Sequence, residues 1–171
     1  MLGKIKSLNE LFEIELRYAY DCERKLVEKG LPAMIEAATS PELRTALQHH
    51  LRETQSHLSR LQNVFSVAGL KPDTKDNEVI DKLMNAAKDS ASNIEATPLR
   101  DTALISNGNA VEHYEIALYG SLASYARQLG LQNAVSVLEE TLREEKAADA
   151  KLTQLAESSA NAKAARAQSA D

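Results

Sequence analysis

Apolar side chains recur every three or four residues along four long stretches of the chain, which is the pattern of helices that bury one face. The first stretch begins at Ser7, which has capping-box spacing with Glu10. Gly30 and Pro32 interrupt it, and a proline inside a helix removes one hydrogen bond and bends the axis. The pattern therefore predicts either one helix kinked at Pro32 or two helices with a break at residues 29–31.

Three further helices have clear start and stop signals. A capping residue followed by proline predicts that the second helix starts at Ser40 and the third at Thr97. Glycine adopts the left-handed conformation that ends many helices, so Gly69 and Gly130 close these two. The fourth helix then covers about residues 131–156.

The connections between the helices predict their arrangement. Those within the first and the last helix pair are short, so each pair is antiparallel, whereas residues 70–96 are long enough to run along the bundle and carry an amphipathic segment of their own. We therefore predict an all-α fold: a ferritin-like four-helix bundle over residues 1–157, with one long crossover that contains a short helix. Residues 158–171 are small and polar with no apolar stripe, and we expect a disordered tail there.

Composition favours one helical domain and excludes several functions. The 171 residues include six Gly and four Pro, too few for the many turns of a β-sandwich or β-barrel. A net charge of −5 with no long basic run disfavours nucleic acid and anionic membranes as partners. Cys22 is the only cysteine, which excludes an intramolecular disulfide and any multi-cysteine metal site. No apolar stretch is long enough to span a membrane and Met1–Lys6 opens no signal peptide, so we expect a cytoplasmic protein.

Acidic residues stand within the apolar stripes, and they recur between the two helix pairs. At one fixed offset the second pair superposes on the first and matches Glu23 with Glu115, Glu53 with Glu145, and His57 with Asp149. Few other identities coincide. The repeat therefore preserves polar residues on faces that should be buried.

Counting from the turns predicts which of these residues are neighbours, because residues equally far from the turn of an antiparallel helix pair lie side by side. In the second pair, the turn near Gly130 places Glu115 beside Glu145 and Glu112 beside Asp149. These pairs share one level of the predicted bundle.

The first pair reaches the same level if its first helix is continuous. One kinked helix places Glu23 beside His57, with Glu53 one turn away on the same face. If the first helix ends at Lys29 instead, Glu15 replaces Glu23. The repeat favours Glu23.

Carboxylates that converge inside a bundle need compensation, because buried like charges raise each other's pKa and destabilise the fold. No comparable set of Lys or Arg follows the stripes. Two divalent metal ions would compensate, and a site rich in carboxylates with few imidazoles suits iron or manganese, with zinc also compatible. The candidate metal ligands are Glu23, Glu53, His57, Glu112, Glu115, Glu145 and Asp149.

Other residues near the stripes have more than one interpretation. His50 precedes Glu53 by one turn, and it either orients a ligand carboxylate or is a hydrogen-bonded core histidine. Tyr119 is either a hydrogen-bonding group near the centre or an amphipathic residue at the bundle edge. Cys22 fits a small buried hydrophobe, and the charged run over residues 144–151 fits a solvated face apart from its two candidate ligands.

Four segments resemble the bacterial YciF-type ferritin-like proteins: ELRYAYDCERKL (15–26), ATSPELRTALQHHLRETQSHL (38–58), DTALISNGNAVEHYEIALYGSL (101–122) and LEETLREEKAADAKL (138–152). The resemblance covers about residues 5–157, and VEHYEIALYG and EEKAADAKL are its most distinctive parts. It implies a rubrerythrin- or ferritin-like fold, a link with stress responses, a homodimer and a dinuclear metal centre.

The chain departs from the ferritin-like dimetal pattern at two positions. That pattern expects His three residues after Glu, whereas Glu53 and His57 are four apart, and Asp149 stands where a His is expected. Both spacings stay on one helix face, so coordination remains feasible. The pair Glu112 and Glu115 is similar to the paired glutamates of rubrerythrin-like sites. Full rubrerythrins carry a cysteine-rich electron-transfer domain that this chain lacks, so turnover would need an external electron donor.

Three functions follow as hypotheses. The one we favour is a di-iron oxidoreductase of the peroxidase or ferroxidase type, which reduces peroxide or oxidises ferrous iron under stress. The alternative is a non-enzymatic stress protein, a helical interaction or assembly module whose metal site is structural or vestigial. The third, iron storage, requires a cage of many subunits.

Overall fold

The first helix pair begins with a continuous helical rod in which one π-helical turn interrupts the α-helix. The computed structural model describes residues 4–167. The rod is made of α1 (Leu8–Lys25), the π-helical segment η1 (Leu26–Gly30) and α2 (Leu31–Ala37). The side chain of Ser7 accepts a hydrogen bond from the backbone N–H of Glu10, which confirms the predicted cap. The helix is not broken, and its irregularity is a π-helical turn before Pro32, whose missing N–H falls in the first turn of α2.

The other three bundle helices begin and end close to the residues that the sequence predicts. They are α3 (Pro41–Val67), α5 (Pro98–Gln128) and α6 (Gln132–Leu155). Ser40 caps α3 by accepting from the N–H of Leu43. Gly69 and Gly130 have φ angles of 70° and 74°, and this left-handed conformation is why glycine ends α3 and α5.

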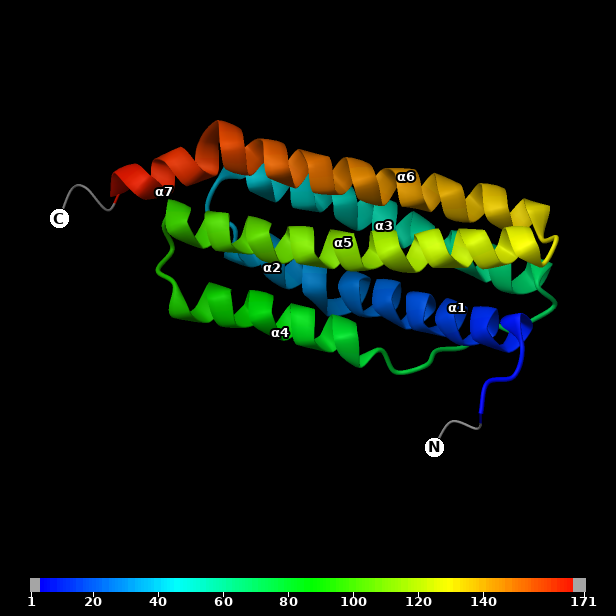
Figure 1. Cartoon of the computed structure of the whole chain (residues 1–171). Coiled ribbons are helices and arrows are strands. Elements are labelled where there is room, and N and C mark those ends of the chain that lie inside the picture. The colour runs from blue at the N-terminus through cyan, green and yellow to red at the C-terminus, as the bar shows by residue number, and fades with distance from the viewer. Residues whose placement is uncertain (1–3, 168–171) are drawn as a thin grey trace.

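The crossover contains α4 (Glu78–Asn93), and the buried Asn77 is one of the residues that tie it to the bundle. Asn77 caps α4, its backbone N–H donates to Asp21, and its amide donates to the Tyr18 carbonyl and the Tyr114 hydroxyl. Figure 1 shows α1 and α6 running in one direction, α3 and α5 in the other, and α4 along the outside of the bundle. The predicted all-helical, ferritin-like arrangement with one crossover is confirmed.

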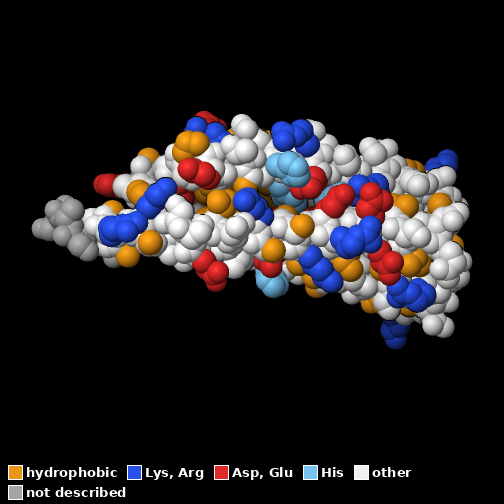
Figure 2. Space-filling view, turned by 90° about the horizontal axis from the view of Figure 1, so that it is seen from above, with side chains coloured by type: hydrophobic (Ala, Val, Ile, Leu, Met, Phe, Trp, Pro, Cys, Tyr) orange, Lys and Arg blue, Asp and Glu red, His pale blue; other side chains and the backbone are white. Residues whose placement is uncertain are grey.

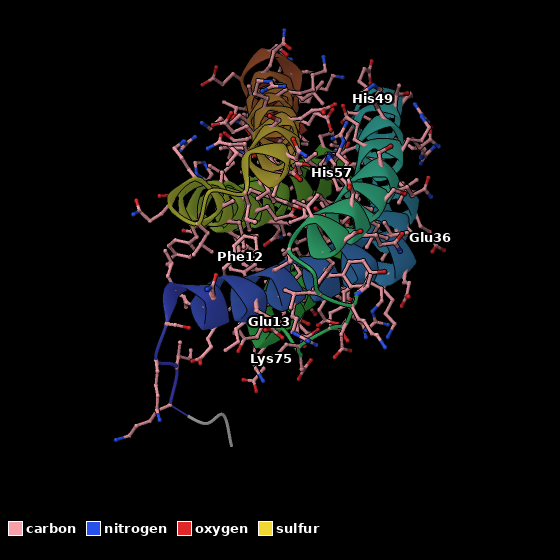
Figure 3. All side chains as sticks on the ribbon, turned by 90° about the vertical axis from the view of Figure 1, so that its right-hand side faces the viewer. Phe12, Glu13, Glu36, His49, His57 and Lys75 are labelled. Atoms are coloured by element: carbon pink, nitrogen blue, oxygen red, sulfur yellow. The ribbon has the colours of Figure 1, made fainter. Side chains whose placement is uncertain are left out.

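The interior consists of two apolar clusters with a polar layer between them. One cluster includes Phe12 and Phe65, and the other includes Leu43 and Leu104. Figure 3 looks along the bundle and shows Phe12 facing inward from α1 and His57 lying in the space between α3 and α6. The polar layer is therefore closed at both ends by apolar side chains.

The predicted disordered tail is wrong for the part of it that the structure describes. The π-helical segment η2 (Ala156–Ala160) and α7 (Asn161–Ala167) continue α6, and α7 packs against α5. Ala160 and Ala164 are buried, so alanines four residues apart provide a narrow apolar stripe that a composition rich in small residues concealed. The rest of the predicted tail, residues 168–171, lies outside the described residues.

No helix among the described residues is both long enough and apolar enough to pass through a membrane.

Candidate metal centre

Six polar side chains from all four bundle helices meet in the polar layer. They are Glu23 on α1, His50 and His57 on α3, Glu112 and Glu115 on α5, and Glu145 on α6, and each is buried. Residues three or seven positions apart lie on the same face of a helix, which is why α3 and α5 each contribute two of them. The polar layer is thus a product of helical spacing on four neighbouring rods.

The first group within this layer contains one histidine and three carboxylates. His50, Glu112, Glu115 and Glu145 each offer one ligand atom, and these atoms all lie within 4.8 Å of one another. Nε2 of His50 is 3.3 Å from Oε1 of Glu112 and 3.7 Å from Oε2 of Glu145. Such a set of nitrogen and oxygen atoms could hold one metal ion.

The second group shares a residue with the first. Ligand atoms of Glu23, His57 and Glu145 also lie within 4.8 Å of one another. Nδ1 of His57 is 3.0 Å from Oε1 of Glu145 and 3.3 Å from Oε1 of Glu23. Glu145 therefore faces His50 with one carboxylate oxygen and His57 with the other.

Many polar atoms in this layer have no hydrogen-bond partner. They are Oε2 of Glu23, Glu112 and Glu115, both carboxylate oxygens of Glu145, and Nδ1 of His50 and His57. Buried polar atoms are nearly always paired, and leaving one unpaired costs about 1–3 kcal/mol. Several orphaned atoms at one place fit a centre that receives cations.

Burial and mutual repulsion oppose ionisation of the carboxylates. Burial raises the pKa of Glu115 well above its usual value, and the nearby Glu145, Glu23 and Glu112 raise it further. Burial likewise raises the pKa of Glu112 well above its usual value, although His50 partly offsets this. The pKa of Glu23 is raised by burial and lowered less strongly by His57. The layer therefore favours protonated carboxyl groups unless positive charge is supplied.

The two histidines supply part of that positive charge. Burial alone would lower the pKa of His50, but Glu112, Glu53 and Glu145 outweigh it and raise the pKa to about 9. Burial would also lower the pKa of His57, and its contacts with Glu145 and Glu23 raise it to about 11. Within residues 4–167, Glu23, Glu112 and Glu145 form ion pairs with these two histidines and with no Lys or Arg, and Glu115 forms none.

Tyr119 and Cys22 also touch the layer. The Tyr119 hydroxyl donates a hydrogen bond to Oε1 of Glu23, and burial raises the pKa of this phenol well above its usual value. Of the two interpretations of Tyr119, the structure therefore supports a hydrogen-bonding group at the centre. The Cys22 thiol lies 3.6 Å from Glu115, and burial raises its pKa well above the usual value, so it is an inert packing residue.

The structure brings together five of the seven predicted ligands and leaves two outside. Glu23, His57, Glu112, Glu115 and Glu145 belong to the two groups, and their binding of metal stays a prediction. The continuous first helix places Glu23 at this level, and Glu15 belongs to neither group.

Glu53 and Asp149 are the two residues that the structure places elsewhere. The Glu53 side chain is 28% exposed and lies 3.1 Å from Nδ1 of His49, while Asp149 is 22% exposed and lies 3.3 Å from Nε2 of His113. His50, one turn from Glu53, takes the inward position, because the rotation of α3 turns that residue towards α5 and α6. The sequence repeat therefore fails at these two positions.

Sequence reasoning also missed Glu144, which lies just outside the layer. Nε2 of His57 is 2.8 Å from Oε2 of Glu144, and the guanidinium of Arg60 donates to both oxygens of the same carboxylate. This residue sits in a run of charges that suggests a solvated face. Only its level beside His57 on the neighbouring helix could have revealed it.

A groove of about 670 Å³ between α3 and α6 lies next to Glu53. Its lining includes Ala46, His49, Ala147 and Leu155. Figure 2 shows a hollow with hydrophobic side chains on this face, next to histidine and acidic side chains. Solvent therefore approaches the polar layer from the side of Glu53.

The fold and the polar layer define a class of protein: a ferritin-like helical bundle with buried carboxylate and histidine groups that could hold metal ions. The chain belongs to the family described as a domain of unknown function, DUF892, which matches residues 7–165. The resemblance to YciF-type proteins is confirmed, because Protein YciF of Escherichia coli strain K12 is 37% identical over 161 residues, 94% of this chain and 96% of its own.

Solved structures agree with this assignment. The crystal structure of the E. coli stress protein YciF has a TM-score of 0.85 and 37% identity, over 89% of this chain and 96% of that one. YcfI from Rhodopseudomonas palustris has a TM-score of 0.84 and 40% identity, over 90% and 97%. A Xanthomonas campestris protein has a TM-score of 0.73 with 24% identity over 95% and 99%, and it supports the fold alone.

Proposed function

We propose that this protein is a dinuclear metal protein of the stress response that holds two ferrous ions. It either reduces peroxide with the electrons of these ions or catalyses the oxidation of ferrous iron. Glu23 and His57 would hold one ion, His50, Glu112 and Glu115 would hold the other, and Glu145 would contribute to both. The link with stress rests on the E. coli relative, which is described as a stress protein.

The orientation of Glu145 carries this proposal. Its Oε2 is 3.7 Å from Nε2 of His50 and its Oε1 is 3.0 Å from Nδ1 of His57, so one buried carboxylate faces both imidazoles. A carboxylate with two oxygens aimed at two nitrogen donors is what a bridging ligand between two metal ions requires. A carboxylate that only paired with a neighbouring histidine would need one oxygen, not both.

Charge supports a stoichiometry of two. Histidine binds metal as the neutral imidazole, so loading expels the protons of His50 and His57. The four carboxylates of the layer then meet two divalent cations, and the buried charges cancel. One cation would leave the layer strongly negative, which a buried site tolerates poorly.

Iron is the metal that we propose, because oxygen-rich sites with a few imidazoles suit it and because it changes valence. When bound, two iron ions supply the electrons for two-electron chemistry on peroxide. The residues of this chain would hold the ions in a layer that apolar clusters close at both ends, which limits the approach of water to the side of Glu53. Tyr119 fixes Glu23 through its hydrogen bond.

The test is anaerobic reconstitution with ferrous iron, followed by peroxide and measurement of bound iron and of ferric absorbance. We expect two ions per chain and rapid oxidation in the wild-type protein, and neither in Glu145→Ala. Glu139→Ala, on the exposed side of the same helix, is the matched control and should behave as wild type. No uptake by the wild-type protein, or oxidation equal to that of Glu145→Ala, would contradict the proposal.

A structural role is the second candidate, favoured by the closure of the polar layer on most sides and by YcfI, which carries the provisional description of a structural protein. It predicts metal uptake and a higher melting temperature without oxidation. The homodimer and the external electron donor stay predictions, and light scattering after size-exclusion chromatography separates a dimer from a cage.

A further inference from the structure

We propose that Glu53 and Glu144 are a matched pair of positioning residues, which hold His50 and His57 in opposite tautomers so that one histidine binds through Nε2 and the other through Nδ1. The inference rests on the proposed metal centre. It concerns two carboxylates that lie outside both groups of candidate ligands.

His57 shows the arrangement in its complete form. Its Nε2 is hydrogen-bonded to Oε2 of Glu144 at 2.8 Å, and its Nδ1 points inward to Glu145 and Glu23. The guanidinium of Arg60 donates to Oε2 of Glu144 at 2.5 Å and to Oε1 at 3.0 Å, so this carboxylate is ionised and can only accept. The proton of a neutral His57 therefore belongs on Nε2, and the lone pair of Nδ1 is left for a metal ion.

His50 shows the same arrangement with its ring reversed. Its Nε2 points inward, 3.3 Å from Glu112 and 3.7 Å from Glu145, and its Nδ1 faces Oε2 of Glu53 at 3.6 Å. That last distance is longer than a hydrogen bond, so the proposal requires the Glu53 side chain to move slightly closer to Nδ1. Glu53 in turn has an outer partner, Nδ1 of His49, at 3.1 Å.

The two outer carboxylates are alike in position and unlike the inner ones. The side chains of Glu53 and Glu144 are 28% and 27% exposed, whereas that of Glu145 is fully buried. Each touches one imidazole nitrogen on its outer side and is itself held by a basic side chain farther out. Two independent histidines with the same outer arrangement indicate a common purpose, which is to fix the nitrogen that faces the centre.

This purpose has a physical reason. A neutral imidazole carries its proton on either nitrogen, and only the unprotonated one can bind a metal ion. A carboxylate on the outer nitrogen fixes the tautomer and the ring orientation, and losing such a partner weakens metal binding by roughly 10- to 100-fold. This outer position also explains why the sequence suggested Glu53 as a ligand. Glu53 lies one turn from His50, the nitrogen donor, but its carboxylate does not reach the centre.

The experiment is a zinc titration of the whole chain, because zinc is diamagnetic and permits nitrogen NMR of the histidines. Wild type, Glu53→Ala, Glu144→Ala and the conservative Glu53→Gln and Glu144→Gln variants are compared. Glu140→Ala is the matched control, because Glu140 touches Arg60 but no histidine. Each alanine variant should still bind two ions per chain, with one of them roughly 10- to 100-fold more weakly, and glutamine should restore part of the affinity because its carbonyl still accepts a hydrogen bond.

Nitrogen-15 spectra of the zinc-loaded wild type provide a readout that a merely structural role would not give. We expect metal on Nδ1 and a proton on Nε2 of His57, and the reverse for His50. In Glu144→Ala, part of the signal of His57 alone should move to that of an imidazole that is metal-free or bound through Nε2, because Glu144 no longer holds the ring. Because the wild-type spectrum reports the tautomers directly, the inference stays testable even if an alanine variant fails to fold.

Four results would overturn the inference. Loss of one ion per chain in both Glu53 variants would make Glu53 a direct ligand. The same metal-bound nitrogen in both histidines, or unchanged affinity in all four variants, would remove the positioning role while the proposed metal centre stood. No zinc or iron uptake by the wild-type protein would overturn the proposed function, and this inference with it.

Discussion

The two helix pairs look equivalent in the sequence repeat, yet they contribute different chemistry to the polar layer. The pair α1 and α3 supplies one carboxylate, Glu23, and both histidines, whereas the pair α5 and α6 supplies three carboxylates and no histidine. One half therefore brings most of the negative charge, and the other brings the groups that offset it. A repeat in the spacing of polar residues does not imply a repeat in their function.

The difference also affects the metal-free protein. The carboxylates of α5 and α6 repel one another across a dry interface, and protonated His50 and His57 on α3 stabilise them. If the layer binds cations as we propose, the same histidines would give up their protons and become ligands. The charge of the helix pair that carries the histidines would then change, whereas the carboxylates of the other pair would accept in both states.

The largest expected effect comes from the one residue that belongs to both groups. Glu145→Ala should abolish binding of both ions, because each group loses a carboxylate oxygen that faces its histidine. Elemental analysis after loading and gel filtration measures this. Asp149→Asn, on the same helix, should keep both ions, and a loss of binding in that variant would restore Asp149 as a ligand.

The next effect distinguishes the two groups of candidate ligands through their histidines, which both lie on α3. His50→Gln and His57→Gln should each lose one ion and retain the other, since each histidine belongs to a single group. Calorimetric titration with zinc counts the ions that remain. If either variant lost both ions, the two groups would be one cooperative unit and the division between them would be wrong.

A pH series tests the charge carried by the histidine half without any metal. The pKa values of His50 and His57 rise from 6.5 to about 9 and about 11 on folding, so they contribute stability that is complete below pH 6.5 and is lost as pH rises through those values. The raised pKa values of Glu112 and Glu115 act in the same direction. Urea unfolding in a chelator should therefore show lower stability at pH 9 than at pH 6.5. His50→Gln should flatten this dependence, and stability that rises with pH would contradict the assigned charges.

The smallest effect concerns one carboxylate of the other half. Glu115 has no ion pair among the described residues and one carboxyl oxygen without a hydrogen-bond partner, so Glu115→Leu should stabilise the metal-free protein by roughly 1–3 kcal/mol, because it removes an unpaired buried polar group. The urea midpoint in a chelator measures it. Glu36→Leu is the control, because Glu36 lies exposed on the outer side of α2 (Figure 3) and should change stability by less than about 0.5 kcal/mol. Destabilisation by Glu115→Leu would mean that the surrounding side chains stabilise the Glu115 carboxyl group and do not disfavour it.

Most of the fold could be predicted because its signals are local. Ser40 with Pro41 starts a helix, and Gly69 and Gly130 end helices by adopting positive φ, whatever the rest of the chain does. The π-helical turn at Leu26–Gly30 was not predictable in this way. It depends on how the rod packs against its neighbours, and the proline beside it suggested a kink instead.

The candidate centre was predicted in part, for a related reason. Glu23, Glu112, Glu115 and Glu145 interrupt apolar stripes, and counting from the turns places them at one level. His50 and Glu53 could not be separated, because residues three apart lie on nearly the same side of a helix and both fit a broad stripe. Glu144 was missed because its partner, His57, lies on another helix.

Local patterns were enough to predict where the helices begin and end, how they connect and which levels of the bundle are polar, because these features depend on backbone conformation and on the spacing of residues along one helix. The tertiary structure decided which polar side chains point inward, which nitrogen of each histidine faces the centre, and that the last described residues pack as a helix. These depend on the rotation and packing of helices against one another, and contacts between distant segments are not encoded in any local pattern.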